Sequence, residues 1–281
     1  MHWPAEAIWE AVAPALPGFT VEIVPEIGST NTELMQRARA GRAEPVLLVA
    51  ERQTAGRGRL GRGWDSGPSA AGPAAAAPAT GAAELPALTF SLGLPLAPRD
   101  WSGLSLAVGV AVAEALDPGG TRIGLKWPND LWVDGRKLAG ILVETAGFAG
   151  PAGAASSQAT AQAPRYAVVG IGINLAPRPA EGLSTPPAAL RELWPEATAG
   201  AALGRIAPGL VATLQAFERE GFAPLQARFA RRDVLRGRPL RLSDGSTGLG
   251  RGVDAGGALQ LQTDAGLTII TSAEVSVRPA G

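Results

Sequence analysis

KWPNDLWVDGRKLAGILVE, residues 126–144, is the stretch of this chain that says most about its fold. Apolar residues at 131–133 and 138–144 favour two strands. The dipeptide between them, Asp134-Gly135, is typical of a two-residue hairpin turn. We therefore predict a β-hairpin here.

The same stretch contains both lysines of the chain, Lys126 and Lys137, whereas all other basic side chains except His2 are arginines. Lysine is a compact charge on a flexible stem, and a planar guanidinium cannot replace it where one small cation must reach a reacting oxygen. Alternatively, both could be ordinary edge-strand charges, but this would not explain why lysine occurs only here. We expect the hairpin to bring the two ammonium groups close together.

The composition excludes several kinds of site. The chain has 281 residues, with 25 basic and 25 acidic side chains, so no net charge draws it to nucleic acid or to an anionic membrane. It has no cysteine, and His2 is its one histidine. Disulfide frameworks, thiol catalysis and Cys/His zinc sites are therefore excluded, and a serine–histidine–aspartate triad would depend on the N-terminal His2. We expect no resident metal.

No segment has the pattern of a targeting signal or a membrane span. Glu6 and Glu10 lie where a signal peptide would carry positive charge, and prolines interrupt the alanine-rich stretch 69–83. We expect a cytoplasmic protein that does not enter membranes.

Further along the chain, strand and helix patterns alternate. We predict strands over residues 20–27, 46–50, 88–94, 122–127 and 166–175. Helices are predicted over 3–16, from a Thr30/Glu33 capping box to about 40, from Asp100 to 116, and within 187–231.

The C-terminal part of the chain has a different pattern of predicted elements. From about residue 236, short strands separated by Asp-Gly and Gly-Gly turns predict a small all-β module. We therefore predict a catalytic domain over 1–233 and a β-barrel over 234–281. Two insertions rich in Ala, Gly, Pro or Ser, at about 66–86 and 147–164, are expected to be disordered.

A glycine–arginine segment, QTAGRGRLGRGW at residues 53–64, is the first candidate for binding a ligand. Its Gly56, Gly58 and Gly61 formally match a dinucleotide fingerprint, but no helix can begin in the glycine- and proline-rich residues that follow. A flexible loop with arginines and free backbone amides suits an anion that is wrapped after it binds. A solvated surface loop and an RNA-binding segment are the alternatives.

A second candidate is VVGIGINL at residues 168–175, a buried apolar strand with glycines at 170 and 172. Alternate glycines strip one face of a strand of side chains, so that either a flat ligand or a closely packed helix can approach the backbone.

Five motifs in one order resemble those of biotin–protein ligases. They are Gly28-Ser-Thr-Asn31, Gln53 with the glycine–arginine loop, Lys126-Trp-Pro-Asn-Asp, Arg136-Lys-Leu-Ala-Gly-Ile-Leu, and Gly170-Ile-Gly-Ile-Asn174. The resemblance implies an α+β fold, with a mixed sheet and flanking helices like those of biotin and lipoate ligases, and a small SH3-like barrel at the C-terminus.

The resemblance also implies a two-step reaction. Biotin's carboxylate attacks the α-phosphorus of ATP, with Mg²⁺ accompanying the nucleotide, and yields biotinyl-5′-AMP and pyrophosphate. A lysine of a biotin carboxyl carrier protein then takes the biotinyl group. The carrier would belong to acetyl-CoA carboxylase and to other biotin enzymes.

The family's site residues map onto this chain by motif. The implied catalytic residues are Lys137, Arg59 and Lys126. The implied biotin contacts are Ser29, Thr30, Asn31, Gln53, Gly56, Arg57, Gly58, Arg59, Lys137, Gly140, Gly170 and Gly172. The implied ATP and adenylate contacts are Arg57, Arg59, Trp64, Lys126, Asn129, Lys137 and Asn174.

Only 27 residues precede Gly28, too few for the winged helix with which bifunctional members bind DNA. We therefore expect a monofunctional ligase that binds no DNA and is a monomer or a homodimer. A lipoate–protein ligase of related architecture is the nearest alternative. A non-enzymatic RNA-binding protein is a more distant one, since the chain lacks a basic excess.

Overall fold

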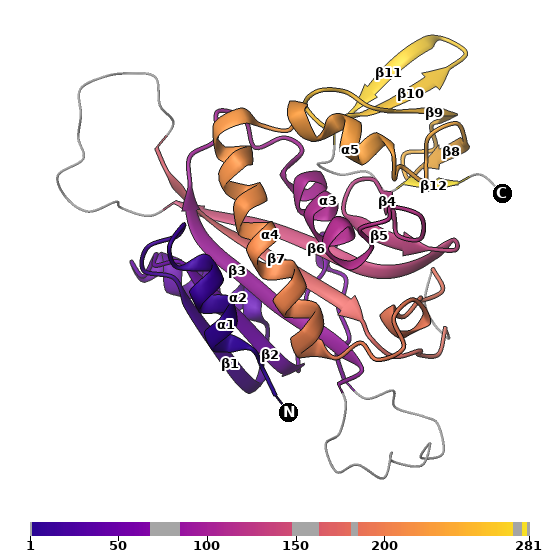
Figure 1. Ribbon diagram of the computed structural model, residues 1–281. Coiled ribbons are helices and arrows are strands. Elements are labelled where there is room, and N and C mark those ends of the chain that lie inside the picture. The colour runs from indigo at the N-terminus through magenta and orange to yellow at the C-terminus, as the bar shows by residue number, and fades with distance from the viewer. Residues whose placement is uncertain (1, 68–84, 148–162, 181–184, 272–276, 280–281) are drawn as a thin grey trace.

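A seven-stranded sheet organises the computed structural model, which describes residues 2–67, 85–147, 163–180, 185–271 and 277–279 (Figure 1). In spatial order its strands are β1 (Thr20–Ile27), β2 (Val46–Gln53), β3 (Ala87–Leu96), β7 (Arg165–Asn174), β6 (Arg136–Gly147), β5 (Asp130–Val133) and β4 (Gly124–Lys126). Strands β1 and β2 run parallel, and the other neighbouring pairs are antiparallel.

Helices cover the two faces of this sheet unequally. On one face lie α1 (Ala5–Val12), α3 (Leu104–Leu116) and α4 (Ala199–Glu220), and on the other lies α2 (Thr30–Arg39). Figure 1 shows α4, in orange, crossing the sheet. The shorter helices are α5 (Gln226–Ala230) and the 3-10 turns η1 (Arg59–Gly61), η2 (Leu190–Glu192) and η3 (Ala223–Leu225). This mixed sheet with flanking helices confirms the predicted fold class.

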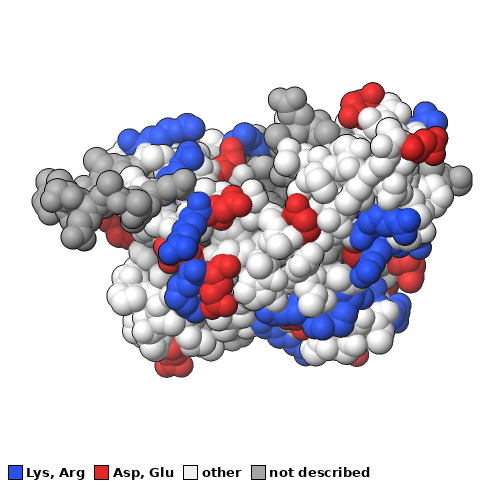
Figure 2. Space-filling model, turned by 90° about the horizontal axis from the view of Figure 1, so that it is seen from above, with Lys and Arg blue, Asp and Glu red and all other residues white. Residues whose placement is uncertain are grey.

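No helix in the described ranges is both long enough and apolar enough to cross a membrane. On the face of the molecule shown in Figure 2, basic and acidic side chains lie interspersed, as the balanced composition leads one to expect.

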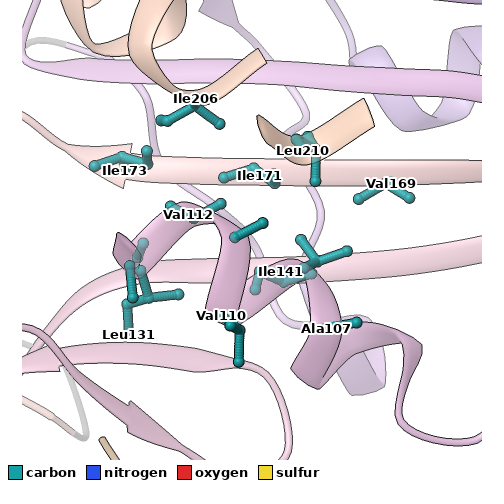
Figure 3. Close-up of a cluster of buried hydrophobic side chains, with 14 of the residues drawn as sticks. Ala107, Val110, Val112, Leu131, Ile141, Val169, Ile171, Ile173, Ile206 and Leu210 are labelled. Atoms are coloured by element: carbon teal, nitrogen blue, oxygen red, sulfur yellow. The ribbon is translucent and has the colours of Figure 1, made fainter. Parts of the chain in front are cut away.

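The two-residue period of the central strands directs their largest apolar cluster to one face of the sheet. Val169, Ile171 and Ile173 of β7 are buried in the core beneath α3 and α4. Figure 3 shows these three side chains in one row, with Ile206 and Leu210 of α4 beside it. Burial of this apolar surface supplies most of the driving force for folding.

The opposite face of the same strands carries a second apolar cluster, with Tyr166 and Val168 of β7 beneath α2, and beside it a patch of small and polar residues. Ser91 of β3 is paired with Gly170 of β7, and Gly172 of β7 is paired with Gly140 of β6. A patch of sheet with few side chains thus lies beside α2.

The predicted hairpin is confirmed. Asp130–Val133 and Arg136–Gly147 pair as antiparallel β5 and β6, joined by Asp134 and Gly135. Both turn residues have positive φ angles, 49° and 75°, as the tight turn between right-twisted strands requires.

Two predicted helix starts are wrong. Ser29, not Thr30, caps α2: its side chain accepts a hydrogen bond from the backbone N–H of Thr32. Helix α3 begins at Leu104 rather than near Asp100, whose carboxylate instead accepts a bond from the backbone N–H of Ser102. Ser29 and Asp100 each accept a hydrogen bond from a nearby backbone N–H group. Short polar side chains can make such bonds at a helix start or in a turn, so their presence alone does not fix where a helix begins.

Helices fill 187–231 only in part. The first half of this range contains the 3-10 turn η2, and α4 begins only at Ala199, where the side chain of Thr198 caps it.

The C-terminal strands form a second, five-stranded antiparallel sheet. In spatial order they are β11 (Gly266–Ile270), β10 (Leu259–Thr263), β9 (Thr247–Val253), β8 (Pro239–Leu242) and β12 (Val277–Pro279). This small sheet fits an SH3-like module. The indole N–H of Trp127 donates to the carbonyl of Gly257 at 3.0 Å, so the Lys-Trp-Pro-Asn-Asp motif contacts the second sheet. The domain boundary between 233 and 234 stays a prediction.

Most of the two insertions lies outside the described residues, at 68–84 and 148–162. The described ends of the insertions are ordered, contrary to expectation. Ser66 is 2% exposed, and its hydroxyl accepts a bond from the backbone N–H of Gln53 at 2.8 Å. Gly147 and Arg165 pair at the ends of β6 and β7.

A buried ion pair ties the end of α3 to the segment that leads into the second sheet. Arg232, with a side chain only 5% exposed, lies 2.9 Å from a carboxylate oxygen of Asp117. Burial by itself would raise the pKa of Asp117, but the backbone N–H groups of Ile123 and Arg122, together with Arg232, outweigh it and lower that pKa below its usual value.

We expect Asp117→Asn to lower the free energy of unfolding by about 3 kcal/mol, because Arg232 then remains buried without its counter-charge. A carboxylate with a lowered pKa contributes stability above its unfolded pKa of about 4, and this contribution is lost as the pH falls through the folded pKa. Urea unfolding should therefore show the full difference from the wild type at pH 6 and a smaller one below about pH 4. A difference that does not vary with pH would contradict this explanation.

Candidate active site

A cavity of about 300 Å³ lies over the polar face of the sheet, between α2, the hairpin and the glycine–arginine segment. Fifteen of the sixteen residues singled out in the sequence line it: Ser29, Thr30, Asn31, Gln53, Arg57, Gly58, Arg59, Trp64, Lys126, Asn129, Lys137, Gly140, Gly170, Gly172 and Asn174. Gly56 lies just outside, where a Cβ atom would be 2.3 Å from the carbonyl oxygen of Trp64. All five motifs thus meet at one cavity.

One end of the cavity presents neutral hydrogen-bonding groups. Gln53 accepts bonds from the backbone N–H and the hydroxyl of Thr30, at 2.8 and 3.1 Å. The buried hydroxyl of Ser91 lies 2.7 Å from that of Thr30 and 2.6 Å from the amide oxygen of Asn31. These groups can both donate and accept, which suits a neutral polar ring such as a urea.

The other end presents positive charge. Lys137 on β6 lies 2.7 Å from Asp130 on β5, and Asp130 is paired in register with Lys126 on β4. The Lys126 ammonium lies 5.0 Å from the ring centre of Trp132, close enough for a cation–π contact. Both lysines line the cavity, but only Lys137 stands on the predicted hairpin, because Lys126 lies on the neighbouring strand β4.

The glycine–arginine segment is not the irregular loop that the sequence suggested. Residues 56–64 form a small hairpin, in which Gly58 N–H donates to Arg62 at 2.7 Å and Trp64 N–H donates to Gly56 at 2.9 Å. Arg57 and Gly63 form a β-bridge. We call residues 56–64 the Gly–Arg hairpin. Its tip turns at Leu60 and Gly61, both with positive φ.

The Gly–Arg hairpin places its arginines at opposite ends of the cavity. Arg57 pairs with Glu144 at 3.1 Å, and Arg59 donates to the side-chain oxygen of Asn129 at 3.4 Å. Burial lowers the pKa of Arg59, with nearby Asp130 acting in the opposite sense, but a guanidinium remains charged at neutral pH. A desolvated cation in this position interacts strongly with an anion.

The indole of Trp64 lies flat against the glycine patch. A Cβ atom on Gly172 would be 2.3 Å from indole Cε2, and one on Gly140 would be 3.6 Å from Cζ3. A Cβ atom on Gly170 would be 2.0 Å from the amide oxygen of Asn31. The glycines therefore make room both for a side chain of α2 and for a flat ring.

The indole N–H of Trp64 is buried without a hydrogen-bond partner among the described residues. Because an unsatisfied buried donor is costly, an acceptor on a bound ligand would be stabilising here.

The sequence and the fold of this chain are similar to those of known proteins. A family model described as the biotin/lipoate A/B protein ligase family matches residues 86–156. The biotin–[acetyl-CoA-carboxylase] ligase of Paracoccus denitrificans is 34% identical over 255 residues, which cover 88% of this chain and 96% of that protein. This chain belongs to the biotin–protein ligase family.

Two further relatives support membership of the biotin–protein ligase family. The bifunctional ligase/repressor BirA of Escherichia coli is 34% identical over 275 residues, which cover 94% of this chain and 76% of that protein. The structure of the biotin protein ligase of Aquifex aeolicus in complex with biotin and ATP matches with a TM-score of 0.69 and 25% identity, covering 92% of this chain and 99% of that one.

Sequence reasoning about this ligase missed several residues at the cavity. Asp130, Trp132 and Arg178 line it, and Ser91 and Glu144 bond to residues that do. Asp130 and Trp132 stand inside the quoted stretch, so their alternation with buried Leu131 could have placed them on the cavity face. Arg178 bonds to Asn174 at 2.9 Å and to Asp65 at 3.2 Å, a contact between distant segments that no local pattern indicates.

The described residues contain no group of three or more His, Asp or Glu side chains that could hold a metal by themselves. Asp130 and Asn129 both line the cavity. One carboxylate together with substrate phosphates is a usual set of Mg²⁺ ligands, so these residues fit a metal that arrives with a nucleotide.

Proposed function

We propose that this protein activates biotin with ATP and then transfers the biotinyl group to a lysine of a biotin carboxyl carrier protein. The observation that carries the proposal is the polarity of one cavity, which is neutral and hydrogen-bonding at one end and cationic at the other. Relatives named as biotin ligases, and a similar structure that holds biotin and ATP, support it.

The neutral end would bind the fused rings of biotin. The ureido group has one carbonyl acceptor and two N–H donors, which complement the hydroxyls of Ser29 and Thr30 and the amide of Gln53. Gly170 and Gly172 make room for the Asn31 amide and the Trp64 indole, and these two side chains would border the ring. The side chain of Trp64 would provide an apolar wall.

The cationic end would hold the reacting groups. Attack of a carboxylate on the α-phosphorus brings two anions together and builds charge on the phosphate oxygens. Lys137, Lys126 and Arg59 would offset that charge, and fixed cations of this kind account for much of the rate enhancement in phosphoryl chemistry. Mg²⁺ bound with the nucleotide would neutralise further phosphate charge.

Neither step needs a covalent bond to the protein. The carboxylate is the nucleophile in the first step and the carrier's lysine amine in the second, so the absence of cysteine is no obstacle. The Gly–Arg hairpin, lying over the cavity, would exclude water and so protect the mixed anhydride from hydrolysis.

A lipoate–protein ligase is the second candidate, because the matching family model includes lipoate ligases. We expect AMP release from ATP when biotin and a biotin carboxyl carrier domain are supplied, and little when lipoate and its own carrier domain replace them. Turnover with lipoate but not with biotin, or no turnover with either acid, would refute the proposal.

Three further expectations belong to the same proposal. We propose a cytoplasmic ligase that does not bind DNA and that acts as a monomer or a homodimer. We also propose that carriers of biotin enzymes other than acetyl-CoA carboxylase are substrates.

A further inference from the structure

An unbroken chain of polar contacts leads from the neutral end of the cavity to the Gly–Arg hairpin. In order, it passes through Gln53, Thr30, Ser91, Asn31, Glu144 and Arg57. It begins at the last residue of β2 and ends four residues further along the same segment. Glu144 is the member that connects the sheet to the hairpin, and none of the roles described above belongs to it.

The carboxylate of Glu144 has a fixed partner on the side of the sheet. Asn31 is 3% exposed, and its amide nitrogen donates to Glu144 at 3.0 Å and to the carbonyl of Leu142 at 3.2 Å. Its amide oxygen faces Ser91 and lies over Gly170. Because both ends of the amide are engaged, it cannot rotate without losing buried hydrogen bonds.

On its other side, Glu144 holds the Gly–Arg hairpin. One carboxylate oxygen lies 3.1 Å from an Arg57 terminal nitrogen, and the other accepts from the second terminal nitrogen at 3.4 Å. Such a two-point contact fixes orientation as well as distance. The Glu144 side chain is 22% exposed and that of Arg57 is 49% exposed, so the pair is shielded on the side of the sheet and screened by solvent on the side of the hairpin.

Because the Gly–Arg hairpin is braced internally, one contact orients all of it. The Arg57–Gly63 bridge and the two cross-strand hydrogen bonds make residues 56–64 a single unit. With Arg57 held at Glu144, Arg59 reaches the cationic end of the cavity and contacts Asn129.

We propose that Glu144 is a positioning residue, which couples the ring-binding network to closure of the Gly–Arg hairpin and thereby retains the adenylate during the reaction. This inference rests on the proposed function as far as the adenylate is concerned. The contact between Glu144 and the hairpin can be tested without any ligand.

The first experiment is limited trypsin digestion of the ligand-free protein. The Gly–Arg hairpin contains Arg57, Arg59 and Arg62, and its exposed tip follows Arg59 directly. Cleavage requires the hairpin to open, since its backbone is bonded across. We expect the Glu144→Gln variant to be cleaved after Arg59 about 5-fold faster than the wild type. The cleavage rate is measured by mass spectrometry.

The matched control for this experiment is Glu26→Gln. It breaks the exposed ion pair between Glu26 and Arg52, which is also an arginine–carboxylate contact. Arg52 lies on β2, just before the Gly–Arg hairpin. We expect this variant to be cleaved at the wild-type rate.

The second experiment measures escape of biotinyl-adenylate by rapid filtration. We expect biotinyl-adenylate to escape about 10-fold faster from Glu144→Gln than from the wild type, because the variant loses one charge-assisted hydrogen bond. The double variant with Arg57→Gln should release no faster than the faster of the two single variants, since both changes break the same contact. A residue that merely stabilised the fold would give additive effects.

Faster cleavage together with faster, non-additive escape would support the proposal. Unchanged cleavage would mean that Glu144 does not hold the hairpin. Faster cleavage with unchanged escape would mean that the contact has no part in retention. If the wild type forms no biotinyl-adenylate, the proposed function fails and the adenylate part of this inference fails with it, whereas the digestion result still stands.

Discussion

Lys137→Ala should slow formation of biotinyl-adenylate by about 100- to 1000-fold, the usual loss when one fixed donor to a developing oxyanion is removed. The Lys137 ammonium is 2.7 Å from Asp130 and faces the cavity beside Gly140. Its removal deletes a cation at the place where two substrate anions must meet. It also leaves the negative charge of the Asp130 carboxylate uncompensated at that place. Repulsion from Asp130 then adds to the lost attraction.

The rate is best followed as biotin-dependent exchange of pyrophosphate into ATP, which isolates the first step from transfer to the carrier. Arg122→Ala is the matched control, because Arg122 pairs with Asp134 at the outer turn of the same hairpin and is 53% exposed. We expect its rate to stay within about twofold of the wild type, as for other exposed pairs. A Lys137→Ala rate within fivefold of the wild type would remove this lysine from the proposed mechanism.

Gly170→Ala should weaken biotin binding by about 50-fold or more and lower the free energy of unfolding by about 1–3 kcal/mol. The added Cβ atom would lie 2.0 Å from the amide oxygen of Asn31, far inside contact distance. Strand β7 is central in the sheet, between β3 and β6, and cannot move away. The amide of Asn31 would have to turn, which disrupts its bonds to Ser91 and Glu144.

Calorimetric titration with biotin and urea unfolding measure the two expected effects separately. Gly147→Ala is the control, because Gly147 lies on neighbouring β6 and a Cβ atom there meets nothing within 4 Å. It should bind biotin as the wild type does. Wild-type affinity in Gly170→Ala would show that Asn31 can move without disturbing the ring-binding end.

Of the two interpretations that the sequence left open for the glycine strand, the structure shows close packing by protein side chains, and the approach of a flat ligand stays a prediction. Gly170 makes room for a side chain of helix α2, and Gly172 makes room for the flat indole of Trp64. Neighbouring positions on one face of a strand are about 7 Å apart, so two different groups can use them. Only the three-dimensional arrangement assigns each glycine its neighbour.

Local chemistry in the sequence was enough for the β5–β6 hairpin, whereas the fold class and the set of cavity residues came from the resemblance to biotin–protein ligases. Asp134-Gly135 can adopt the positive φ angles of a tight turn, and the alternation of apolar residues in β7 defines its buried face, whatever the rest of the chain does. Both lysines line one cavity because strands β4 and β6, which carry them, lie on either side of β5.

Contacts between residues far apart in the chain were decided only by tertiary structure. The cap of α2 shifted to Ser29 because the Thr30 hydroxyl instead bonds to Gln53, and the glycine–arginine segment became a braced hairpin that Glu144 holds from another strand. No spacing along the sequence encodes which carboxylate will face Arg57, because that depends on how strands β6 and β2 are arranged in the sheet. Polar partners of this kind are selected by burial, since a buried group must find one wherever the fold provides it.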